Sequence, residues 1–169
     1  MSALEHMSIS ALIGRLDDSD PGAVYEAIEE LGRREATEAA PHLLEMLRTS
    51  DDAAVRNYAA LALSDMRNPE VLDVIAGLLQ DPRTAGSRGT LLYALEPYDC
   101  SPILELLVDL AITGNWEVSR SALGLLTGVN GDIGEELWSR LRDRVLAALS
   151  TADEEQRIEV LEPLLEMFV

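Results

Sequence analysis

Adjacent acidic residues are the side chains of this sequence best suited to chemistry. They occur at positions 17–18, 51–52 and 153–155. Paired carboxylates can hold a metal ion or share acid and base roles, but a hydrolase needs the two groups to face each other across a cleft. Each group here precedes an expected helix, where free N–H groups and the helix dipole favour negative charge. Helix capping therefore explains most of these acids, and we assign none of them to catalysis or to a metal.

Nucleophilic and metal-binding side chains are scarce. The sequence has two histidines, His6 and His42, and one cysteine, Cys100. No zinc pattern or calcium loop occurs, and neither histidine lies in a motif with a nucleophile. The glycines of 128–132 lack the strand, lysine and spacing of a phosphate-binding loop. We therefore expect a protein that is not an enzyme, with no catalytic, cofactor-binding or metal-binding residue.

The charge of the chain is strongly acidic. There are 31 Asp and Glu residues against 13 basic ones, which gives a net charge of −18, and every basic residue is Arg. Such a surface repels phosphate backbones, so we expect no nucleic-acid partner. It favours a basic protein partner through electrostatic steering. Solubility, or a salt-adapted or GC-rich source, explains the same charge without any function.

The N-terminus and the hydropathy bear on localisation. Residues 1–7 have neither a cationic start nor an apolar segment, and we interpret them as a flexible N-terminus or a cloning remnant. No apolar run approaches the roughly 20 residues that a membrane span requires. A single cysteine forms no internal disulfide, which is typical of a reducing compartment. We therefore expect a cytoplasmic protein that does not bind membranes.

Internal repeats are the main signal for the fold. An apolar cluster with helical spacing recurs after 31, 31, 32 and 39 residues, at 12–16, 43–47, 74–78, 106–110 and 145–149. A second motif follows each cluster and is clearest at 51–63, which reads Asp-Asp-Ala-Ala-Val-Arg-Asn-Tyr-Ala-Ala-Leu-Ala-Leu. Two helices per repeat follow from this pattern, and no strand pattern competes with it.

The string at 51–63 resembles the short HEAT-like repeats, which also occur in bilin lyases and bacterial adaptor proteins. The resemblance extends over 9–168, although the later repeats are degenerate. It implies an all-α fold, a right-handed α-α superhelix of about five helix pairs. We expect one solenoid over 8–169, with repeats at 8–35, 36–67, 68–99, 100–130 and 131–169.

Capping residues and prolines set the expected helix boundaries. Asp20, Asn68 and Ser101 each precede a proline suited to the first helical position. Pro163 should kink the last helix. The predicted helices are 8–16, 21–34, 38–48, 52–66, 69–80, 84–96, 102–113, 115–128, 133–149 and 152–167.

The resemblance also implies a ladder of acidic and arginine side chains along the stack. The matching pairs are Asp51 or Asp52 with Arg56, Asp81 with Arg88, and Asp153 with Arg157. Carboxylate–guanidinium pairs could form a ligand site. Their repetition favours instead a scaffold that orients neighbouring repeats.

The second helix of each repeat should line the concave face of the solenoid. Residues that lie beside the repeating apolar positions of these helices would then contact a partner. One row holds Glu26, Asn57, Gly89, Arg120 and Ile158, and another holds Glu30, Leu61, Tyr93, Gly124 and Glu162. Exposed Tyr and Leu between acids suit a segment that carries Arg or Lys. Leu61 and Tyr93 could equally cover the neighbouring repeat. The predicted protein-binding residues are Glu26, Glu30, Asn57, Leu61, Tyr93, Arg120, Glu159 and Glu162.

Two classes of function remain open. The first is a non-enzymatic interaction module, either an adaptor or an inhibitor of the immunity-protein type, that presents an acidic, partly apolar face to a basic protein. The alternative is a small-ligand role like that of the bilin lyases, which would need a pocket of cofactor size with converging polar groups. The sequence displays no such group of residues.

Overall fold

The structure of the protein is a computed structural model that describes residues 3–129 and 133–168. All regular elements in these two ranges are helices, which confirms the all-α class. They form two compact units, Met1–Pro97 and Tyr98–Val169. The single solenoid, its repeat boundaries and its right-handed superhelix stay predictions.

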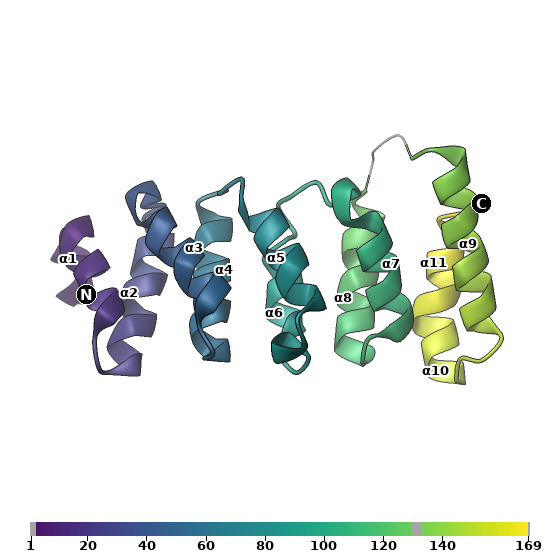
Figure 1. The fold of residues 1–169 in the computed structure, drawn as a ribbon, viewed down its shortest axis with the longest axis horizontal. Coiled ribbons are helices and arrows are strands. Elements are labelled where there is room, and N and C mark those ends of the chain that lie inside the picture. Colours follow the sequence, from purple (N-terminus) through teal and green to yellow (C-terminus); the bar gives the residue numbers. More distant parts are fainter. Residues whose placement is uncertain (1–2, 130–132, 169) are drawn as a thin grey trace. The chain divides into compact units, whose positions relative to one another are not determined.

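The first unit contains three helix pairs, seen in Figure 1 as α1/α2, α3/α4 and α5/α6. Helix α2 packs on α4, and α4 packs on α3, α5 and α6. Second helices therefore lie beside second helices, as in a solenoid. The bounds are η1 Ala3–His6, α1 Ile9–Gly14, η2 Arg15–Asp17, α2 Pro21–Arg33, η3 Thr37–Ala39, α3 Ala40–Thr49, α4 Ala53–Asp65, α5 Val71–Gln80, η4 Pro82–Thr84 and α6 Arg88–Tyr93.

The second unit contains the remaining two pairs. Helix α7 packs on α8 and α9, and α9 packs on the C-terminal helix. The bounds are η5 Ser101–Ile103, α7 Leu104–Thr113, α8 Trp116–Thr127, α9 Glu135–Leu149, α10 Glu154–Gln156, the π-helical turn η6 Arg157–Leu161 and α11 Glu162–Glu166. The helices of both units therefore follow one another in the order that the repeats predicted.

Small residues bring the second helices of the first unit into close contact. A Cβ added to Gly32 of α2 would lie 2.8 Å from the Cα of Ala62 on α4, so only glycine fits this crossing. Many apolar residues of the recurring clusters are buried, among them Leu12, Leu43 and Leu107, although Leu146 is exposed. Ala27 and Ala59 on the second helices are buried as well. Burial of these apolar side chains is the main stabilising force in such stacked pairs.

The helix ends differ in detail from the predicted ones. Asp20 caps α2 through a bond from Gly22 N–H, as expected. Ser101 caps no helix, because its own N–H and hydroxyl both donate to Asp99. Glu35 and Arg67 follow the ends of α2 and α4 with φ of 50° and 52°, the left-handed conformation that usually falls to glycine.

Pro163 disturbs the last helix, as expected. A proline removes one backbone donor and crowds the preceding turn. The chain widens into the π-helical turn Arg157–Leu161 directly before α11, in which Pro163 occupies the first turn. The last predicted helix, 152–167, is therefore three short segments.

Candidate protein-binding site

The second helices of the first unit present part of the predicted site. Glu26 on α2 is exposed, and Tyr93 at the end of α6 is 60% exposed. Leu61 on α4 is half-buried between them. Tyr93 is therefore largely uncovered by its neighbours, whereas Leu61 is partly covered. An exposed tyrosine is a common member of protein contacts, since aromatic residues are enriched there.

Glu30 lies in a different environment from the one predicted. It is 8% exposed, and its carboxylate accepts bonds from Arg33 at 2.6 and 2.8 Å and from Arg34 at 2.6 Å. Arg34 in turn donates to the carbonyls of Leu4 and Met7 at 2.6 and 2.7 Å. Glu30 therefore orients the arginine that holds the N-terminal segment, and its burial removes it from the exposed face.

The predicted ladder exists in a modified form. Arg56 is 2% exposed and donates from Nη1 to the carbonyl of Ser50 at 2.9 Å, and it pairs with no carboxylate there. Its Nη2 lies 3.5 Å from the hydroxyl of Ser87 in the next repeat. Asp52 caps α4 through Ala54 N–H and accepts the Tyr25 hydroxyl at 2.9 Å. The backbone bond from Ala54 and the tyrosine bond both lower the pKa of Asp52.

The other two ladder pairs are also replaced. Arg88 donates weakly to the backbone carbonyl of Asp81 at 3.4 Å. The carboxylate of Asp81 pairs instead with Arg83 at 2.8 Å, which lowers the pKa of Asp81. Asp153 caps the start of α10, since its Oδ1 atom accepts a bond from the N–H group of Gln156 at 2.8 Å. The guanidinium of Arg157 pairs with Glu162 at 3.4 Å, and the bond from Arg157 to Asp153 is a main-chain one, from its N–H to the Asp153 carbonyl at 3.0 Å. These residues act as scaffold, but through caps and carbonyls.

Asn57 is the predicted site residue with an unusual environment. The residue is half-buried, and its Oδ1 atom has no hydrogen-bond partner within the described part of the chain. The same is true of Arg56 Nε beside it. A buried amide oxygen costs stability when it is unpaired. Asn57 is therefore too deeply placed to serve as a simple surface contact.

The second unit presents an aromatic and charged patch on α8 and η6. Arg120 forms an ion pair with Glu159, and its guanidinium lies 5.0 Å from the ring centroid of Trp116. Trp116 is 56% exposed, and Ile158 is 47% exposed. The prediction placed Arg120 and Glu159 in the site, and the structure brings these two together. We name Trp116, Arg120, Ile158 and Glu159 the tryptophan patch.

Trp116 was missed by the sequence reasoning. It is the first residue of α8, two positions before the buried Val118. The corresponding position in the clearest repeat, at 51–63, is an alanine. Comparison of equivalent positions in the repeats therefore did not indicate an aromatic contact residue here. An isolated tryptophan at a helix start, outside the apolar columns, was the available signal.

A small hollow lies beside Trp116. It has a volume of about 210 Å³ and lies between the start of α8 and the turn that leads into α10. Trp116, Asp153 and Glu155 line it with exposed side chains, whereas Ser119 and Val160 line it with buried ones. Its lining therefore combines an indole, two carboxylates and an apolar base.

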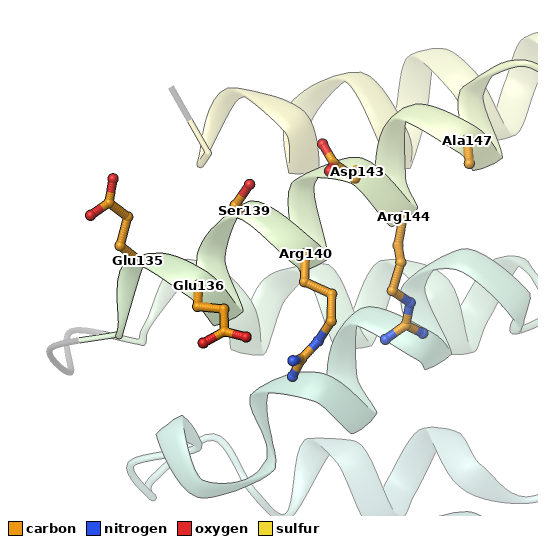
Figure 2. Close-up of a pocket in the computed structure, with 7 residues that line it drawn as sticks. All are labelled: Glu135, Glu136, Ser139, Arg140, Asp143, Arg144 and Ala147. Carbon is orange, nitrogen blue, oxygen red and sulfur yellow. The ribbon is translucent and has the colours of Figure 1, made fainter.

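A larger, open groove of about 780 Å³ runs along α9 (Figure 2). Arg140 and Arg144 extend from one side of the helix in this view, and they pair with Glu105 and Asp109 of α7. The remaining lining is largely acidic, from Glu135, Glu136 and Asp143. Its two cations are already held by α7, so the groove gives no support to a small-ligand site.

Trp138 and Cys100 both pack against buried parts of the second unit. Trp138 is half-buried, and the centroid of its ring lies 4.5 Å from that of the buried Phe168. Cys100 is buried, and burial together with the charge of Asp99 raises the pKa of its thiol to about 11. Such a thiol stays protonated at neutral pH and is a poor nucleophile.

The described residues also bear on metals and membranes. No cluster of three or more His, Cys, Asp or Glu side chains suited to a metal occurs in 3–129 or 133–168. Of the helices described, none combines the length and apolar character that a membrane crossing requires.

Comparison with known proteins agrees with the repeat pattern. No protein of curated function matches the sequence. The family model of the HEAT repeats matches residues 9–96, which is more than half of the chain and contains the string at 51–63. With its stacked helix pairs, the chain belongs to the HEAT-repeat family.

Proposed function

We propose that this protein is a non-enzymatic interaction module, an adaptor or an inhibitor, whose second helices bind a basic protein. HEAT repeats are commonly protein-interaction modules, which supports the first part. No observation on the described residues favours the alternative of a small-ligand protein.

One observation carries the proposal. Among the described residues, the large apolar side chains that stay most exposed are Tyr93, Trp116, Leu146 and Ile158. Three of these four lie on second helices: α6, α8 and η6. Large exposed apolar groups are costly in water unless a partner covers them. Their positions on second helices support the proposal that a partner binds there.

The charge of the same helices indicates the chemistry of the partner. Glu26 and Glu29 on α2, Glu117 on α8, and Glu155, Glu159 and Glu162 at the C-terminal end are exposed. Acids around an apolar contact favour a basic partner, both in the encounter and in the complex. The net charge of −18 strengthens this preference at low salt.

Affinity capture from the source organism, followed by binding measurements with charge variants, tests the proposal. The variant Glu26→Gln/Glu159→Gln/Glu162→Gln removes three acids from the second helices. The control Glu45→Gln/Glu135→Gln/Glu136→Gln removes three exposed acids from first helices. Both variants carry a net charge of −15, because three charges are removed from −18.

We expect the captured protein to be basic and to bind the first variant at least roughly tenfold more weakly than the control, since each rim charge contributes up to about 1 kcal/mol. Equal binding of both variants would show that the acids of the second helices are not the contact surface. Capture of small molecules in place of a protein would refute the proposal that this protein is an interaction module.

A further inference from the structure

We propose that the hollow beside Trp116 receives an arginine side chain of the basic partner. This inference rests on the proposed function, since it names the chemical group by which the partner is recognised. The hollow is lined by Trp116, Asp153, Glu155, Ser119 and Val160, and we call it the arginine pocket.

The size of the arginine pocket suits one side chain. Its volume of about 210 Å³ is below the roughly 300–1,000 Å³ of pockets for small molecules of drug size. Ser119 and Val160 are almost fully buried and make its inner wall. The Ser119 hydroxyl already donates to the carbonyl of Gly114 at 3.1 Å, which fixes that wall.

The lining matches the chemistry of a guanidinium group. Asp153 uses its Oδ1 atom to cap Gln156 N–H, which leaves its other oxygen to accept from a ligand. Glu155 contributes a second carboxylate to the same pocket. A guanidinium is planar, donates two parallel bonds to a carboxylate and stacks on aromatic rings. An indole beside two carboxylates offers both kinds of contact.

The protein's own Arg120 supplies the internal precedent. Its guanidinium lies over the Trp116 ring, 5.0 Å from the centroid, and it is bound to the carboxylate of Glu159. The same indole therefore already accepts one guanidinium through a cation–π contact. Glu159 neutralises the charge of Arg120. The two carboxylates of the arginine pocket are therefore left to balance the charge of a second guanidinium, that of the partner.

The test uses two synthetic peptides, acetyl-Gly-Gly-Arg-Gly-Gly-amide and the same peptide with citrulline in place of arginine. Citrulline keeps the shape but has no charge. The two tryptophans give two indole N–H signals in a ¹H–¹⁵N spectrum. Trp138 packs on Phe168 and serves as the internal control.

We expect the Trp116 signal to move saturably with the arginine peptide, the Trp138 signal to stay in place, and the citrulline peptide to bind at least tenfold more weakly. The variant Asp153→Asn/Glu155→Gln should weaken arginine binding at least tenfold, since asparagine preserves the helix cap. The control Glu135→Gln/Glu136→Gln should bind like the wild type.

Equal shifts with both peptides, or unchanged binding by the pocket variant, would overturn the inference. The proposed function is judged separately by the single substitution Glu26→Gln on α2, which leaves Trp116, Arg120, Glu159 and the two acids of the arginine pocket intact. A partner that responds to that variant but not to Asp153→Asn/Glu155→Gln would refute the arginine pocket alone.

Discussion

Replacing Glu30 by glutamine should destabilise the first unit and reduce its sensitivity to acid. The Glu30 carboxylate is buried and accepts three bonds from Arg33 and Arg34. The hydrogen bonds from Arg33, with a smaller contribution from Arg34, lower the pKa of Glu30 from 4.5 to about 2, although burial alone would raise it. The ionised form is therefore the one that the fold stabilises.

The magnitude follows from this pKa. The interval between 4.5 and about 2 corresponds to roughly 3 kcal/mol, at about 1.4 kcal/mol for each pH unit. The side chain of Arg33 is 61% exposed, so water screens part of the interaction. We therefore expect Glu30→Gln to lower the free energy of unfolding by about 1–2 kcal/mol at pH 7.

The pH dependence has a definite sign. A lowered pKa in the folded state means that the stabilisation is complete above pH 4.5 and is lost as the pH falls toward about 2. Urea unfolding, followed by circular dichroism at pH 7 and at about pH 2.5, measures the difference between wild type and variant. That difference should shrink at the lower pH.

Glu29→Gln is the matched control, because Glu29 is exposed, lies next to Glu30 on α2 and loses the same charge. It should change the free energy of unfolding by less than about 0.5 kcal/mol. If Glu29→Gln costs as much as Glu30→Gln, or if the cost of Glu30→Gln is the same at both pH values, the reasoning about the buried carboxylate is refuted.

Three further substitutions test the packing of the first unit by urea unfolding. Gly32→Ala should cost about 1–3 kcal/mol, because its Cβ would lie 2.8 Å from the Cα of Ala62. Ser64→Ala should cost about 1–2 kcal/mol, because the buried Ser64 hydroxyl donates to the carbonyl of Ala94 at 2.8 Å. Glu35→Gly should raise the stability by roughly 0.5–1 kcal/mol, because its φ of 50° suits glycine.

Each of these substitutions has a control on the same chain. Gly77→Ala in α5 meets no atom within 4 Å and should not destabilise the protein, so an equal loss at both glycines would contradict the close crossing. Ser10→Ala, at an exposed position, should be nearly neutral. Glu35→Ala keeps the strain, so a gain equal to that of Glu35→Gly would contradict the conformational explanation.

The helix pairs could be predicted because apolar residues recur with both helical and repeat spacing. The prediction fails where local hydrogen bonds compete with the helix. The helix expected at 84–96 forms only over Arg88–Tyr93. It starts late because the N–H group of Arg83 donates to the Asp81 carboxylate, and this bond begins the short 3-10 turn Pro82–Thr84. Gly86 in the following turn further favours a late helix start.

The exposure of the predicted site residues agrees with their positions in the rows only in part. Glu26 and Tyr93 are exposed, as those positions suggested. The ion pair between Arg120 and Glu159 was not predicted, because Glu159 stands in neither row. Glu30 shares a row with Tyr93, but position in a row does not reveal that two arginines follow it closely enough to cover its carboxylate. The exposure of Trp116 depends in turn on which residues surround the start of α8, and a repeat pattern does not contain that information.

Three of the bonds that join neighbouring helix pairs end on main-chain oxygens. Ser64 reaches the carbonyl of Ala94, Arg67 that of Pro97, and Gln156 that of Ile112. Every amino acid, proline included, supplies this acceptor. A repeat can therefore diverge by mutation, or arise by duplication of its neighbour, and still offer the same attachment point. At these three points a degenerate copy of the motif at 51–63 can therefore be held as firmly as a clear one.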